Sequence, residues 1–137
     1  MNRLMLAAIV AALGALAGCQ TQGTPAAAGS GGGGKSAALL SMEQVATAAY
    51  RCWFDSKDPL FRSYSFANEL NSFSGRPRFL VVPKNNFGGK PLLVVQAEGA
   101  EGRVSAFGPM MDGEHSVRIA ADIGRWRTGD GSCSASA

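Results

Sequence analysis

Catalytic and metal-ligating side chains are scarce in this chain of 137 residues. It contains one histidine and three cysteines, and only 17% of its residues are charged. A structural zinc site needs four ligands, drawn mainly from Cys and His, and no Gly-x-Ser-x-Gly motif is present to support a serine nucleophile. The length allows one domain at most. It excludes a Rossmann enzyme with a separate substrate domain, a TIM barrel and a multi-span membrane protein.

Long hydrophobic runs are also missing, apart from one at the start of the chain. Leu4–Ala17 holds only Leu, Met, Ala, Ile, Val and Gly, and Arg3 precedes it. A membrane-spanning helix needs about 20 apolar residues, so this run of 14 residues is short for a permanent span. Its length, its positive flank and the small residues at its end are typical of a secretory signal peptide. We predict that residues 1–18 form one.

Leu16-Ala17-Gly18-Cys19 resembles the lipobox of bacterial lipoprotein precursors, in which Leu, a small residue and Gly or Ala precede Cys. In that family the cysteine thiol receives a diacylglyceryl group, the preceding peptide is removed, and the new amine is usually acylated. The resemblance implies that Cys19 is a lipid anchor, since two or three acyl chains bind a membrane stably where one exchanges. The alternatives are an ordinary leader that happens to contain a cysteine and a buried apolar helix.

The residue after Cys19 bears on which membrane receives the protein. In the Gram-negative lipoproteins that this chain resembles, Asp at that position favours the inner membrane, whereas here it is Gln20. The resemblance therefore implies a location in the cell envelope, at the periplasmic side of the outer membrane.

Residues 19–38 are predicted to form the anchor and a flexible tether. Gln20–Ala38 has one charged residue, no aromatic residue and no large aliphatic one, so it cannot bury enough apolar surface to fold. A Gly-rich coil of this length spans about 24 Å. Gly31–Ser36 superficially resembles a phosphate-binding loop, but such a loop follows a strand, and none is predicted before it. We interpret it as linker, followed by one small domain over residues 39–137.

The sequence of this domain predicts an α+β fold that begins with a helix. Ser41 and Gln44 match a capping box, and Leu40 with Val45 makes the matching hydrophobic staple. We expect the helix to start at Ser41, and residues at helical spacing define its buried stripe. These are Val45, Ala49, Cys52 and Trp53.

Three or four antiparallel strands are predicted next. Alternating or Val/Leu-rich runs at Tyr64–Phe66, Phe79–Val82 and Leu92–Val95 favour strands. Val104–Phe107 is predicted to be a fourth, shorter strand. Turn-forming residues between the second and third runs indicate a hairpin with a long loop.

The last segment, Val117–Thr128, is ambiguous. Ile119, Ile123 and Trp126 recur at i, i+4 and i+7, which favours a helix. Val117–Ile119 alone could instead finish a strand, and Gly124 lowers the helix propensity. We predict a C-terminal helix.

Cys52 and Cys133 remain once Cys19 is lipidated. In an exported protein two such cysteines usually pair, because the compartment is oxidising. Two free thiols or an intermolecular bond are the alternatives. We predict a disulfide that joins the first helix to the end of the domain.

The one histidine, His115, stands close to two acids, Asp112 and Glu114. These three could form a metal site or an acid/base pair, but three polar residues on one Gly-containing turn seldom converge on a ligand. We interpret the segment as a solvated turn and predict no catalytic residue, metal or cofactor. The alternative is a minor envelope enzyme or an enzyme inhibitor that uses the Asp112–His115 turn or an unrecognised cleft.

Charge distribution suggests a binding surface. Between residues 71 and 97 there are four basic residues and no acid, which could attract an anionic partner. Lysines beside a hairpin could equally serve only to discourage edge pairing. The possible partner-binding residues are Phe73, Arg76, Arg78, Lys84, Phe87 and Lys90.

The predicted function is that of a non-catalytic binding or assembly module held on a membrane by its N-terminal lipid. Possible partners are an envelope protein, peptidoglycan or lipopolysaccharide, and nucleic acid is not expected. Most aromatic residues are expected to pack in the core and not in a ligand cleft. These are Trp53, Phe54, Tyr64, Phe66, Phe79, Phe107 and Trp126.

Overall fold

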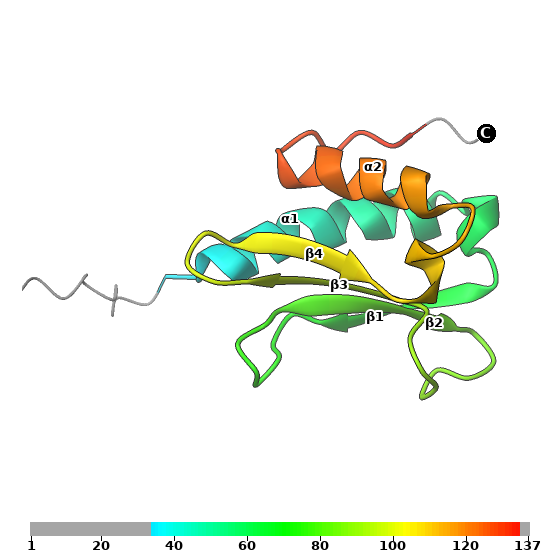
Figure 1. Ribbon diagram of the computed structural model, residues 1–137, viewed down its shortest axis with the longest axis horizontal. Helices are drawn as coiled ribbons and strands as arrows, with labels where there is room; N and C mark the ends of the chain where they lie inside the picture. Colours follow the sequence, from blue (N-terminus) through cyan, green and yellow to red (C-terminus); the bar gives the residue numbers. More distant parts are fainter. Residues whose placement is uncertain (1–33, 135–137) are drawn as a thin grey trace, which may run out of the picture. The chain divides into compact units, whose positions relative to one another are not determined.

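Two helices cover one face of a four-stranded antiparallel sheet in the computed structural model, which describes residues 34–134 (Figure 1). The fold is therefore α+β, as predicted. The strands follow one another in sequence order across the sheet. The elements are α1 (Ala37–Ala49), β1 (Tyr64–Glu69), β2 (Arg78–Pro83), β3 (Leu93–Glu98), β4 (Arg103–Phe107) and α2 (Ser116–Arg127).

Helix α1 starts four residues before the predicted capping box, so that prediction is wrong. Ser36 is the N-cap, and its hydroxyl accepts a hydrogen bond of 3.2 Å from the backbone N–H of Leu39. This bond satisfies one of the N–H groups that a helix start leaves free. Ala38, predicted to lie in the tether, is buried in the core. After Ala49 the chain continues as a π-helical segment, Tyr50–Asp55.

The four strands form a meander whose register sorts side chains onto two faces. Phe79 pairs with Val95 and Val81 with Leu93, and all four side chains are buried beneath the helices. The hairpin predicted between β2 and β3 is confirmed. Alternate residues point to the other face, which no described helix covers (Figure 1).

The core lies between the inner face of the sheet and the two helices, and aromatic rings form its centre. The ring of Trp53 lies 4.4 Å from that of Phe61 and 4.9 Å from that of Trp126, centroid to centroid. Helix α2, the element that the sequence left ambiguous, presents a buried stripe to this centre. The stripe consists of Ile119, Asp122, Ile123 and Trp126.

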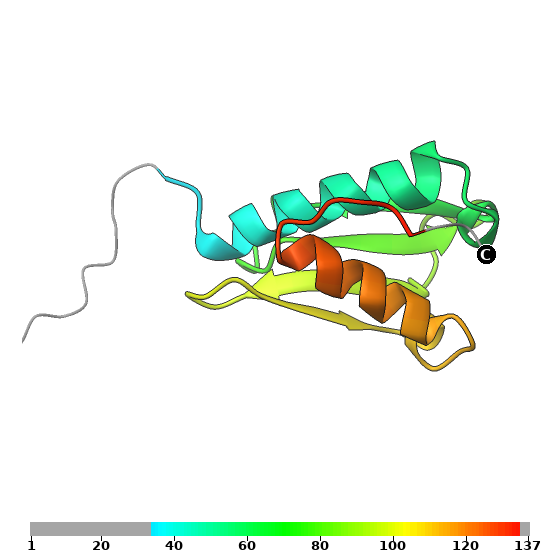
Figure 2. The same ribbon diagram turned by 90° about the horizontal axis from the view of Figure 1, so that it is seen from above.

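The predicted disulfide between Cys52 and Cys133 is present, with the two Cα atoms 5.2 Å apart. It fixes the segment after α2 across the two helices, and this segment runs along their junction in Figure 2. The carbonyl of Ser132 accepts hydrogen bonds from the indole N–H of Trp126 at 2.9 Å and from Nε of Arg125 at 3.1 Å. The end of the domain thus holds α2 against α1.

The predicted signal peptide, Cys19 and the predicted tether as far as residue 33 lie outside the described residues. Among the helices of residues 34–134, none is long and apolar enough to cross a membrane.

Candidate functional site

The β1–β2 and β2–β3 loops leave the sheet at opposite ends, and both project away from the helices (Figure 1). Each carries an exposed phenylalanine. Phe73, in the first loop, is fully exposed, and Phe87, in the second, is 61% exposed. Binding residues are disproportionately found on loops that a rigid scaffold positions. We call the two loops and the uncovered sheet face between them the loop face.

Two of the four predicted basic residues have acidic partners. Nε of Arg78 lies 2.6 Å from Oε2 of Glu69, and Nε of Arg76 lies 3.1 Å from Oε2 of Glu98. These acids flank the acid-free stretch in sequence, and strand pairing brings each next to an arginine. The loop face is therefore less positive than the sequence predicted. Within residues 34–134, Lys84 and Lys90 form no ion pair.

Phe107 also belongs to this face, so its predicted place in the core is wrong. Its register partner is Val94, and both belong to the set of alternate residues that points away from the helices. Phe107 is 48% exposed. Together with Phe73 and Phe87, it gives the loop face an aromatic character.

The Asp112–His115 turn lies immediately before α2, with His115 at the N-cap position. Nε2 of His115 lies 3.3 Å from Oε1 of Glu114, and both residues are solvent-exposed. No group of three or more metal-ligating side chains occurs among the residues that the structure describes.

The phosphate-loop resemblance falls partly within the described chain. The ammonium of Lys35 contacts both carboxylate oxygens of Glu43, at 2.6 and 2.7 Å. Ser36 caps α1. The two side chains that would contact a nucleotide thus interact with α1 instead. Residues 31–33 lie outside the described residues.

Two buried carboxylates, Asp58 and Asp122, were not predicted from the sequence, and Arg118 lies between them. Asp122 accepts hydrogen bonds from the indole of Trp53 at 2.9 Å, from Nη2 of Arg125 at 2.6 Å and from the hydroxyl of Ser134 at 3.2 Å. The helical stripe that includes Asp122 was recognised only through its apolar members. A buried charge needs such partners, so we interpret these hydrogen bonds as stabilising the fold.

Asp58 is the second buried acid, and Arg118 of α2 binds both of its carboxylate oxygens. Burial by itself would raise the pKa of Asp58. The hydrogen bonds from Arg118 and from the N–H of Leu60, together with the charge of Arg118, outweigh that effect and hold the pKa below its ordinary value. Asp58 therefore ties the turn after α1 to α2 as a carboxylate.

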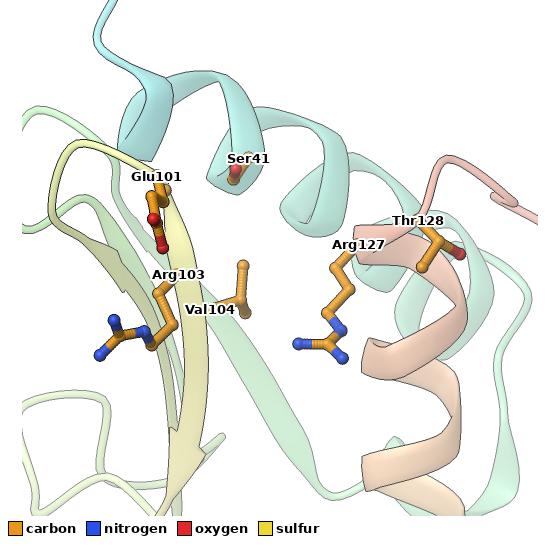
Figure 3. Close-up of a pocket in the computed structure, with 7 residues that line it drawn as sticks. Ser41, Glu101, Arg103, Val104, Arg127 and Thr128 are labelled. Carbon is orange, nitrogen blue, oxygen red and sulfur yellow. The ribbon is translucent and has the colours of Figure 1, made fainter.

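A pocket of about 320 Å³ lies between the free edge of β4 and the C-terminal end of α2 (Figure 3). Val104 of β4 lines the pocket, and the side chain of Arg127 reaches from α2 toward the strand. The turn before β4 closes the upper end. There Gly102 has φ +63°, and a Cβ on it would lie 2.5 Å from the hydroxyl of Ser41 and 2.6 Å from the carbonyl of Ala37. Only glycine allows this contact with α1.

Comparison with known proteins identifies no relative: no family model, curated protein or solved structure matches this chain.

We expect Asp58→Asn to lower the free energy of unfolding by about 2 kcal/mol at pH 6, because hydrogen bonds to a charged partner are lost. The difference from the wild type should shrink as the pH falls. A carboxyl whose folded pKa is depressed stabilises the fold fully above its unfolded pKa of about 3.9 and loses that contribution as the pH passes its folded pKa. Urea unfolding at pH 6 and at pH 2.5 measures both effects.

The matched control is Asp55→Asn, since Asp55 is exposed. This variant should unfold like the wild type at pH 6. A difference between Asp58→Asn and the wild type that stays constant over this pH range would contradict the assignment of Asp58 as an ion-paired carboxylate.

Proposed function

We propose that this protein is a lipid-anchored lipoprotein of the cell envelope, whose domain is a non-catalytic binding module facing the periplasm. The observation that carries the proposal is Leu16-Ala17-Gly18-Cys19 at the end of a signal-like hydrophobic run. Acylated Cys19 is the anchor, and the Gly/Ala-rich stretch after it lets the domain stand away from the lipid surface.

The Cys52–Cys133 bond supports export. Disulfides persist in oxidising compartments such as the bacterial periplasm and are rare in the cytosol. Small exported domains are often stapled in this way because their cores are small. A domain that ends in a disulfide therefore fits the destination that the lipobox implies.

A binding role is favoured over catalysis because the buried acidic side chains are already engaged in hydrogen bonds within the domain. The two buried acids, Asp58 and Asp122, are occupied by arginines and by Trp53, while His115 and Glu114 stand in solvent. The loop face, by contrast, offers Phe73, which no residue of the described chain covers. Exposed aromatic side chains on loops are the usual anchors of protein contacts.

The partner that fits the loop face best is an envelope protein. Aromatic contacts dominate this face, because Arg76 and Arg78 are paired with acids and contribute less positive charge than four free cations would. A polyanion such as lipopolysaccharide would depend more on charge. The remaining cations, Lys84 and Lys90, flank Phe87 and would steer an acidic protein surface toward it.

Metabolic labelling with an alkyne analogue of palmitate tests the anchor in a Gram-negative host. The wild type should incorporate the label and fractionate with membranes, because Cys19 carries the acyl chains. Cys19→Ser should lose the label and keep its leader. The matched control, Cys52→Ser combined with Cys133→Ser, should still incorporate the label, because Cys19 is intact. Label on Cys19→Ser, or none on the wild type, would refute lipidation.

Photocrosslinking in intact cells tests the loop face. A photoreactive amino acid at Phe73 or Phe87 should give one abundant protein adduct, because both side chains would lie in the contact. The same group at Val117 or Tyr50 is the control, since these residues are 79% and 52% exposed on the helical side. Equal adducts from all four positions, or none from the loops, would count against this surface.

A further inference from the structure

The free edge of β4 is a second open surface, separate from the loop face. In the sheet of residues 34–134, β4 is a terminal strand that pairs only with β3. Among the described residues, the backbone N–H and C=O groups on its other side have no strand partner. Such an edge can accept an extended peptide as an additional strand.

Two arginines flank this edge on opposite faces of the sheet. Arg103 belongs to the set of β4 residues that points away from the helices, whereas Val104 points toward them. Arg127 belongs to α2, on the helical side, and its guanidinium extends toward the strand (Figure 3). An added strand would present alternate side chains to the two faces, so two consecutive residues would meet one arginine each.

The charge around the edge is unbalanced. Within the described part of the chain, neither Arg103 nor Arg127 forms an ion pair with an acid. Among the described residues, Glu101 is the one acid lining the pocket, at its turn end. Glu98, the register partner of Arg103, is paired with Arg76. With the Arg76–Glu98 pair neutral, Arg103 and Arg127 against Glu101 leave a net positive site beside unpaired backbone, which complements a peptide with acidic side chains.

We propose that the edge of β4 binds an extended acidic segment of another protein, which adds to the sheet as a fifth strand. Its backbone pairs with β4, its carboxylates meet Arg103 and Arg127, and an apolar side chain contacts Val104 in the pocket. This site requires neither lipidation nor the loop face, so its test is independent of the function proposed above.

Fluorescence anisotropy with a labelled peptide of sequence VEEVEEV tests this proposal on the full-length chain in detergent. The peptide should bind, and VKKVKKV should not, because the site is positive. A VEEVEEV peptide methylated at alternate backbone nitrogens should also fail to bind, because strand addition needs those N–H groups. Absence of VEEVEEV binding, or equal binding of the methylated or lysine peptide, would overturn the proposal.

Substitution identifies the site. Arg127→Glu should raise the dissociation constant of VEEVEEV at least fivefold, since an attraction becomes a repulsion. Arg62→Glu is the matched control, because Arg62 is exposed and does not line this pocket; it should change binding less than twofold. Both variants must keep the wild-type thermal unfolding midpoint. Wild-type affinity in Arg127→Glu, or equal losses in the two variants, would place the peptide elsewhere.

Discussion

The segment after α2 holds the helical layer together, and the remaining architecture depends on that closure. Cys133 is bonded to Cys52, which lies in the π-helical segment after α1. The carbonyl of Ser132 accepts a hydrogen bond from the indole N–H of Trp126, and the hydroxyl of Ser134 donates one to Asp122. The same few residues thus fix α2 covalently and provide hydrogen-bond partners for buried polar groups. Without partners, these groups would lower the stability of the fold. With α2 fixed, Arg127 is held beside β4. The loop face lies on the opposite side of the sheet, free of these contacts.

Much of this fold could be predicted because its signals are local. The β2–β3 hairpin has two Val/Leu-rich runs separated by turn formers, and α2 has apolar residues at helical spacing. The prediction of the disulfide needed only the count of cysteines and the expectation that the chain is exported. The start of α1 was missed because two serines, Ser36 and Ser41, can both cap a helix. The earlier one is used because Ala38 then packs into the core.

The features that sequence could not supply are those that join distant residues. Arg118 donates a hydrogen bond to Asp58, sixty positions earlier in the sequence. The indole of Trp53 donates one to Asp122, 69 positions later. Glu69 and Glu98 border an apparently acid-free stretch, yet strand register places both against its arginines. The pocket at β4 likewise depends on which strand ends the sheet, and no periodicity in the sequence reveals that order.

The central claim is that the Cys52–Cys133 bond closes the domain, and reduction tests it most directly. Closing a loop of 81 residues is worth about 4–5 kcal/mol in unfolded-state entropy, a large share of the 5–15 kcal/mol typical of a domain. Urea unfolding followed by the fluorescence of Trp53 and Trp126 should show that loss when dithiothreitol is added. The Cys52→Ser, Cys133→Ser double variant should already be destabilised and should not respond to it. A reduced protein within about 1 kcal/mol of the oxidised one would contradict the account.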